Sequence, residues 1–158
     1  MSSIVVVAAI RCLLILLFLP FSALDKLLNF RAAVGQAAQA SASHGLAVLL
    51  ILCGLAVEVL MSLAVLTGFH DRPAALVLAA YCIVTALLWK QFWRTPDFRL
   101  RGASAGRELF WDFLKNLALA GGFLVLAVGA NAAEVHRFWH DPLGSTEPYA
   151  AQPPAGDR

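Results

Sequence analysis

Two charged residues lie inside long apolar runs, where a charge needs either a partner or a function. Glu58 falls near the middle of the run from 46 to 69, and Arg11 falls close to the middle of the run from 4 to 24. An offset of about three residues puts Arg11 roughly 4–5 Å from the midplane of a bilayer. A charged side chain at the centre of a membrane helix costs about 2.5–3.5 kcal/mol. We therefore expect Arg11 and Glu58 to pair with each other on adjacent antiparallel helices.

A second set of polar residues falls near one end of the apolar runs. Asp112 and Lys115 are three residues apart in a helical segment, so they share a face and can form a local ion pair. Asp25 and Lys26 end the first run on the same side of the membrane. The candidate residues for a buried polar core or ligand-binding site are Arg11, Asp25, Lys26, Glu58, Asp112, Lys115 and Asn116.

Small residues indicate which helix faces carry these charges. Gly54, Glu58 and Ser62 are spaced by four, so Glu58 lies on a stripe of small residues. Such stripes let membrane helices approach closely. A similar stripe further along contains Lys115, Ala118, Gly122 and Gly129. We therefore expect the charged residues to face neighbouring helices rather than lipid.

The composition predicts an all-α membrane fold. The chain has 158 residues, of which 60% are hydrophobic and 14% charged, whereas soluble domains have about 25% charged residues. A transmembrane helix needs roughly 20 apolar residues. Runs of that length cover 4–24, 46–69, 73–93 and 109–130. They predict a four-transmembrane-helix bundle over residues 1–140, followed by a proline-rich, disordered tail over 141–158.

The third apolar run is expected to serve only packing. Between Pro73 and Trp89 it carries no ionisable group other than Tyr81 and Cys82. Asp71 precedes this run in a tight hairpin, outside the predicted membrane core.

The distribution of lysine and arginine predicts the orientation in the membrane, because cytoplasmic connections carry an excess of both. One side holds Lys26, Arg31, Lys90, Arg94, Arg99, Arg101 and Arg107. The other side holds Arg72, Arg137 and Arg158. We therefore expect the connections 25–45 and 94–108 to be cytoplasmic and both termini to lie outside.

Motifs for several functional classes are absent from the sequence. The four runs contain no histidine that could serve as an axial haem ligand, and the chain has no glycine-rich dinucleotide fingerprint and no P-loop. Its three cysteines form no CxxC pair, and His136 and His140 lack a clear third metal ligand. We expect no catalytic residue, no metal site and no intrinsic cofactor.

Several stretches together resemble the DoxX family of small four-helix bacterial membrane proteins. They are Arg11–Phe18, Phe21–Phe30, Gly54–Glu58, Leu66–Gly68, Arg72–Ala75 and Phe113–Gly122. The resemblance covers roughly residues 8–130, and it departs from the family where Ala23-Leu24-Asp25 precedes Lys26, a place at which many members have glycine. It implies that Arg11, Lys26, Glu58, Lys115 and Asn116 are the family-type polar positions.

The resemblance also implies a bacterial inner-membrane protein with a quinone or redox connection. The family takes its name from a terminal quinol oxidase, and related small subunits act in thiosulfate:quinone oxidoreduction. One hypothesis is an accessory subunit that binds a quinone head group near Arg11, Glu58 and Lys115. The alternatives are a small-solute or proton pathway with Glu58 and Lys115 as relay groups, and a structural or assembly protein whose ion pairs fix helix register.

The expected partners follow from these hypotheses. They are the lipid bilayer, other membrane or redox subunits, and a second copy of the chain. The formal net charge of +2 gives no indication of a nucleic-acid partner.

Overall fold

The computed structural model describes residues 3–39 and 43–150, and every regular element in these ranges is helical. The elements are α1 (Ser3–Ile15), η1 (Leu17–Ser22), α2 (Ala23–Leu28), α3 (Phe30–Ala38), α4 (His44–Thr67), α5 (Asp71–Trp89), η2 (Phe92–Arg94), α6 (Ala105–Val128) and α7 (Ala132–His140). Four stretches are long and apolar enough to span a membrane: Ser3–Leu28, His44–Thr67, Asp71–Arg94 and Ala105–Val128. The all-α fold with four transmembrane helices is therefore confirmed.

The first span is bent in its middle. Pro20 lies inside the π-helical segment η1, and Leu19 beside it has a non-helical backbone, with φ −123° and ψ 112°. Proline removes a backbone donor and clashes with the preceding turn, which explains the bend. The span therefore consists of two helices, α1 and α2, on either side of the bend.

The second and third spans form a hairpin with a tight turn. Ser43 caps the start of α4 by accepting a hydrogen bond from the backbone N–H of Leu46 at 3.2 Å. Gly68 ends α4 in the left-handed conformation, with φ +81°, and α5 begins at Asp71. Before α4, the short helix α3 folds back on it through Val34 and Ala37, which pack against Ala47.

The connection before α6 and the turn after it are both held by side-chain caps. Asp97 accepts the backbone N–H groups of Ala105 and Gly106 at 2.9 and 3.1 Å. After α6, Asn131 accepts from the N–H of Glu134 at 3.1 Å, and Glu134 accepts from the N–H of Ala130 at 2.7 Å. This reciprocal cap starts α7, a helix that the sequence analysis did not single out.

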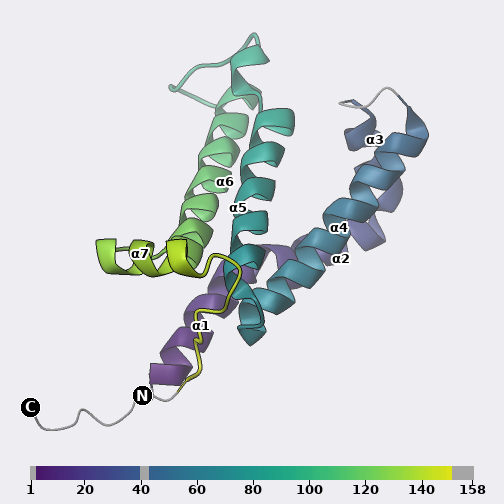
Figure 1. Cartoon of the computed structure of the whole chain (residues 1–158). Helices are drawn as coiled ribbons and strands as arrows, with labels where there is room; N and C mark the ends of the chain where they lie inside the picture. Colours follow the sequence, from purple (N-terminus) through teal and green to yellow (C-terminus); the bar gives the residue numbers. More distant parts are fainter. Residues whose placement is uncertain (1–2, 40–42, 151–158) are drawn as a thin grey trace, which may run out of the picture.

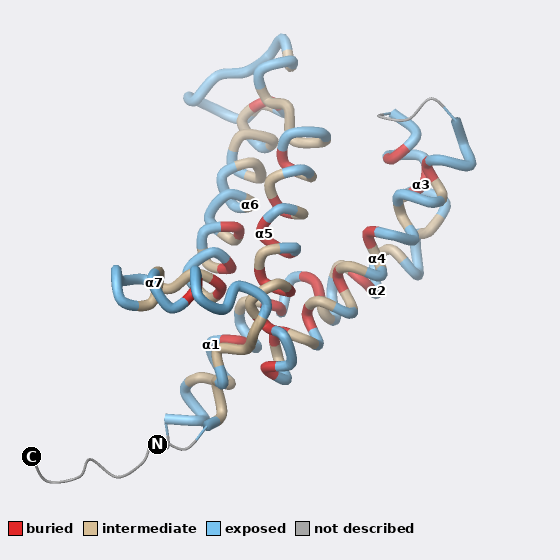
Figure 2. Tube along the Cα trace, viewed as in Figure 1, coloured by how far each residue is buried: buried red, intermediate tan, exposed pale blue. Residues whose placement is uncertain are grey.

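The spans form two arms that cross near one end and diverge toward the other (Figure 1). The first arm comprises α1 to α4, residues 3–67, and the second arm comprises α5 and α6, residues 71–128. Buried residues concentrate where the arms cross (Figure 2). The core there includes Phe18, Val65, Leu78 and Phe123. Most other large apolar side chains are exposed, as expected for surfaces that face lipid.

The segment after α7 differs from the expected disordered tail. Residues 141–150 lie across the α4–α5 turn, and Ser145 and Tyr149 donate hydrogen bonds to the backbone carbonyls of Gly68 and Leu66, at 2.6 and 2.5 Å. Hydrogen bonds from these polar side chains to backbone carbonyls of the turn hold the segment in place. The rest of the predicted tail, residues 151–158, lies outside the described residues.

Candidate functional site

Glu58 on α4 is the centre of a buried polar group, which we call the Glu58 cluster. Its side chain is 1% exposed. The ammonium group of Lys26 lies 2.6 Å from Oε1 of Glu58, and Ser22 and Tyr81 donate to the same oxygen at 3.1 and 2.9 Å. Three donors therefore converge on one carboxylate oxygen.

The other carboxylate oxygen of Glu58, Oε2, accepts no hydrogen bond from the described residues. Oε2 is buried and has no hydrogen-bond partner within residues 3–39 and 43–150. A buried carboxylate oxygen without a donor is unfavourable by roughly 1–3 kcal/mol or more. The cluster thus contains an acceptor that could still take a donor.

The Glu58 cluster lies at the wall of a cavity of about 690 Å³ between the two arms, which we call the inter-arm cavity. Its apolar lining includes Leu17, Phe18, Leu50, Ile51, Val57 and Leu88. Trp89 also lines the cavity, and its indole Nε1 is buried with no acceptor in the part of the chain that the structure describes. The cavity therefore combines an apolar lining with one unpaired acceptor and one unpaired donor.

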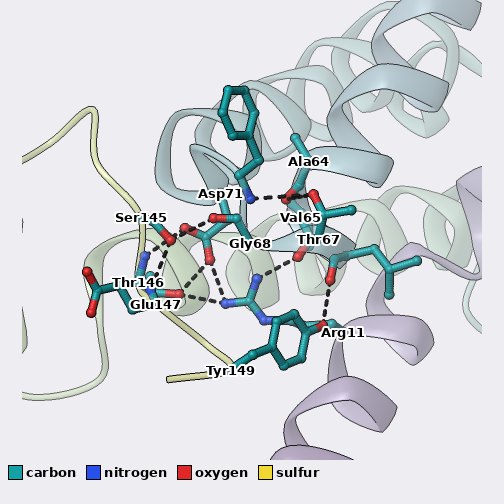
Figure 3. Close-up of polar contacts among 12 residues, drawn as sticks. Arg11, Ala64, Val65, Thr67, Gly68, Asp71, Ser145, Thr146, Glu147 and Tyr149 are labelled. Atoms are coloured by element: carbon teal, nitrogen blue, oxygen red, sulfur yellow. Dashed lines mark hydrogen bonds and ion pairs between the residues drawn. The ribbon is translucent and has the colours of Figure 1, made fainter. Parts of the chain in front are cut away.

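A second buried group, the Arg11 cluster, lies at the α4–α5 turn (Figure 3). Arg11 is 5% exposed and Asp71 is fully buried, and their Nη2 and Oδ2 atoms lie 2.6 Å apart. Arg11 also donates to the backbone carbonyl of Val65 at 2.5 Å. Thr146 from the segment after α7 completes the cluster: Arg11 donates to its hydroxyl at 2.6 Å, and its backbone N–H and hydroxyl donate to Asp71 at 2.8 and 2.5 Å.

The predicted pairing of Arg11 with Glu58 is therefore wrong. Arg11 contacts Val65, which is seven residues along α4 from Glu58, or about 10 Å at 1.5 Å per residue. The bend at Pro20 is the physical reason, because a broken first span does not keep Arg11 at the depth that a straight helix would give it. Each of the two residues forms an ion pair with another residue: Arg11 with Asp71, and Glu58 with Lys26.

The third group surrounds Asp112. Lys115 lies 3.2 Å from Asp112, which confirms the predicted local pair, and Lys90 of the preceding connection lies 3.1 Å from the same carboxylate. Asn116 donates to the backbone carbonyl of Asp112 at 2.9 Å. All four side chains line the inter-arm cavity, on the second arm. Lys115 nevertheless stays 74% exposed, so the expectation that it is buried between helices is wrong.

Asp25 lies apart from these groups. It is exposed, accepts a hydrogen bond from the Asn29 amide at 2.7 Å, and lines neither of the two cavities described. Of the seven predicted residues, five line the inter-arm cavity: Lys26, Glu58, Asp112, Lys115 and Asn116. Arg11 belongs to the other cluster. The role of all seven in binding stays a prediction.

One of the two predicted small-residue stripes faces the core. Gly54, Glu58 and Ser62 are all buried on α4, and a Cβ at Gly54 would lie 3.1 Å from the Tyr81 hydroxyl. On α6, the stripe from Lys115 to Gly129 does not face the core. The face that packs there carries Ala120, Phe123 and Ala127, because the aromatic ring of Phe123 fills the space at the crossing of the arms.

Three polar partners of the buried charges were not predicted from the sequence. Asp71 and Tyr81 belong to α5, which was expected to serve only packing, and Thr146 belongs to the expected tail. Tyr81 could have been recognised as a donor, since a phenol in a membrane span needs an acceptor. Asp71 and Thr146 carry no such signal, because their contact joins positions 75 residues apart.

The structure also places the two neighbouring histidines of α7. The Nε2 atoms of His136 and His140 lie 3.4 Å apart. Within residues 3–39 and 43–150, no group of three or more histidine, cysteine, aspartate or glutamate side chains is placed to hold a metal ion.

Four membrane-spanning helices with charged residues buried between them define a small multi-pass membrane protein, and comparison with known sequences gives its family. The DoxX family model matches residues 6–91, just over half of the chain, and the chain belongs to this family. The match extends from α1 to α5 and includes Arg11, Lys26, Glu58, Asp71 and Tyr81.

One curated relative is the inner membrane protein YphA of Escherichia coli (strain K12). It is 27% identical over 128 residues, which cover 80% of this chain and 85% of YphA. Together with the four apolar helices, this similarity supports a multi-pass protein of the inner membrane. No solved structure matches the chain.

Proposed function

We propose that this DoxX-family protein is an accessory membrane subunit of a redox system, and that its inter-arm cavity binds the head group of a quinone. One observation carries the proposal: Glu58, a buried carboxylate with an unpaired oxygen, stands at the wall of a mostly apolar cavity. Small-molecule sites typically have volumes of about 300–1,000 Å³, an apolar lining and a few polar groups that fix orientation. The cavity, at about 690 Å³, fits that description.

The polar groups match the chemistry of a quinone and its reduced form. The carbonyl oxygens of a quinone accept hydrogen bonds, and two residues that line the cavity can donate them: Lys26, whose ammonium group has a third N–H beyond those directed at Ser22 and Glu58, and Trp89, whose indole N–H is unpaired among the described residues. The hydroxyl groups of a quinol also donate, and Oε2 of Glu58 would accept from one of them after a small side-chain rotation. A site with both donors and an acceptor can hold either redox form.

The apolar lining suits the remainder of such a molecule. Leu17, Leu50 and Leu88 line the cavity and are themselves exposed on the lipid-facing surface. An isoprenoid tail could therefore leave between the arms without crossing a polar region. The role proposed for this chain is to bind and position the quinone, while a partner subunit supplies the electrons.

Binding to purified protein tests the proposal. A short-chain ubiquinone titrated into the full chain in mild detergent should bind saturably, as followed by quenching of tryptophan fluorescence. Glu58→Gln and Tyr81→Phe should each weaken binding roughly 3- to 10-fold, the loss expected for one hydrogen bond of about 1 kcal/mol or slightly more. Glu108→Gln is the matched control, because Glu108 is exposed at the start of α6 and does not line the cavity. Equal affinities of Glu58→Gln, Glu108→Gln and wild type would remove the proposal.

A specific observation also favours a proton pathway as a second candidate. Glu58, Ser62 and the Val65 carbonyl follow one buried face of α4, and the Ser62 hydroxyl is buried without a partner in the described ranges. This line joins the Glu58 cluster to the Arg11 cluster over about 10 Å. Proteoliposomes carrying an internal pH dye should then show proton uptake that Glu58→Gln abolishes and Glu108→Gln leaves unchanged. Identical uptake in empty liposomes would rule this candidate out.

A further inference from the structure

A second cavity, of about 370 Å³, lies where α1, the end of α6 and α7 meet. Arg11, Arg72 and Arg137 line it with one acidic residue, Glu134, so we call it the arginine cavity. It shares no lining residue with the inter-arm cavity. A ligand in the arginine cavity would therefore use none of the residues that line the proposed quinone site.

Two of the three arginines have no ion-pair partner among residues 3–39 and 43–150. The charge of Arg11 is paired with Asp71, and its Nη atoms also donate to Thr146 and Val65. Arg72 donates through Nη1 to the Asp141 carbonyl at 2.6 Å, but its Nε is buried without an acceptor in the described part of the chain.

Arg137 adds the second positive charge. Among residues 3–39 and 43–150 no hydrogen bond or ion pair involves its side chain, which is exposed on α7. The neighbouring Glu134 accepts from the Ala130 N–H at 2.7 Å and so is engaged in capping α7. The polar end of the cavity therefore presents an excess of guanidinium groups, which suit phosphate oxygens because of their planar, forked donor geometry.

The other end of the cavity is aliphatic. Ile10 and Leu14 of α1 line it opposite Val125 and Leu126 of α6. A Cβ at Gly122 would lie 2.9 Å from the Leu14 side chain, so the glycine lets α1 approach α6 and form the floor of a groove. From Gly129 to Gly122 the groove runs along seven residues of chain, or about 10 Å.

The helix α7 indicates the depth in the membrane at which the polar end of the arginine cavity lies. It runs across the end of α6 rather than continuing it (Figure 1). Phe138 on one face is buried, while Trp139 is 72% exposed. A short helix with an apolar and a polar face, and with tryptophan at its surface, is typical of the membrane–water interface. Arg72 and Arg137 would then lie at the level of lipid headgroups, with the aliphatic groove below them.

We propose that the arginine cavity binds an anionic phospholipid, with its phosphate against Arg72 and Arg137 and the first part of one acyl chain between α1 and α6. The positive charge of the arginines favours an anionic ligand. The aliphatic groove favours a lipid, because a soluble phosphate would leave the apolar half of the cavity without a matching surface. Basic pockets between transmembrane helices bind acidic lipid headgroups in the same manner.

Native mass spectrometry of the full chain, released from a neutral detergent, tests this inference. The protein is titrated with phosphatidylglycerol, with phosphatidylcholine of the same acyl chains, and with inorganic phosphate alone. Phosphatidylglycerol should bind more tightly than phosphatidylcholine, and Arg137→Gln should reduce its affinity roughly fivefold. Arg101→Gln is the charge-matched control, because Arg101 is exposed in the connection before α6.

A second pair of variants tests the groove without changing charge. Val125→Trp fills the groove and should weaken both lipids, whereas Leu124→Trp, one residue away and outside the cavity lining, should weaken neither. Melting temperatures in detergent without added lipid show whether each variant is folded. Equal affinity for the two lipids, equal losses in Arg137→Gln and Arg101→Gln, or displacement of phosphatidylglycerol by phosphate at similar concentrations would each overturn the proposal.

Discussion

At the scale of single residues, the buried charges are arranged as two separate pairs, Lys26–Glu58 and Arg11–Asp71, each with further hydroxyl donors. The two pairs differ in what surrounds them. In the Arg11 cluster, both carboxylate oxygens of Asp71 have a donor, and Val65 and Thr146 also accept from Arg11. The Glu58 cluster is open, because Oε2 has no partner among the described residues and the cavity lies beside it. We therefore propose a structural role for the first pair and a binding role for the second.

This assignment predicts that Asp71→Asn destabilises the protein. Removing one partner of a buried ion pair leaves an uncompensated charge and costs about 3–5 kcal/mol. Unfolding in mild detergent, followed by circular dichroism, should show a loss of that size. Asp25→Asn, at an exposed carboxylate, should change stability by less than about 0.5 kcal/mol. Equal stability of the two variants would show that the Arg11–Asp71 pair contributes nothing to folding.

At the scale of elements, two breaks in regular helix decide where the charges meet. The bend at Pro20 separates α1 from α2, so that Arg11 and Lys26 serve different clusters although they belong to one span. The turn at Gly68 ends α4 and provides the carbonyls on which residues 141–150 rest. Both breaks depend on residues with special backbone properties, proline in one case and glycine in the other.

The contact between Gly68 and the segment after α7 leads to a prediction about how firmly that segment is docked. In Gly68→Ala the new Cβ would lie 2.7 Å from Pro148 Cγ at a backbone φ of +81°, which disfavours side chains by roughly 1–2 kcal/mol. The segment 141–150 should then detach, and limited proteolysis should cleave it faster than in wild type.

A second glycine provides the control for that experiment. Gly121→Ala lies inside α6 with nothing within 4 Å of the new Cβ, so it should leave cleavage unchanged. A cleavage rate in Gly68→Ala equal to that of Gly121→Ala would contradict the docking of this segment.

Contacts between residues that are close in the sequence could be predicted, whereas contacts between residues that are far apart in the sequence could not. The four spans and the Asp112–Lys115 pair were predicted correctly, because hydropathy and three-residue spacing are local properties. The partners of Arg11 were not, because they depend on the depth set by a bend and on a segment 135 residues away. Pro20 is visible in the sequence and could have warned of a bend, but its direction is set by packing that no local pattern encodes.

At the scale of the whole molecule, the two arms cross near one end and diverge toward the other (Figure 1). The inter-arm cavity lies in the separated part, on the side of the basic connections, and the arginine cavity lies where the arms cross. If the basic connections are cytoplasmic, the proposed quinone site is close to the cytoplasmic surface and the proposed lipid site close to the outer one.

This orientation predicts the location of the C-terminus. Alkaline phosphatase fused after Arg158 should be active, because this enzyme folds only outside the cytoplasm. Green fluorescent protein fused at the same position should not fluoresce, because it does not fold after export through the Sec pathway. The same reporters inserted after Arg101 should give the opposite result, since that connection is expected in the cytoplasm. Reversed signals at the two positions would show that the orientation is inverted.

Photoaffinity labelling with an azido-ubiquinone, mapped by peptide mass spectrometry, reports where a quinone lies on the protein. If the quinone binds in the inter-arm cavity, labels are expected on peptides from α2, α4 and α5 around Lys26, Glu58 and Tyr81. Unlabelled ubiquinone should compete for these labels, and Glu58→Gln but not Glu108→Gln should reduce them. Labels that are confined to the lipid-facing surfaces of α1 and α6, or that are insensitive to competition, would contradict a quinone site in this cavity.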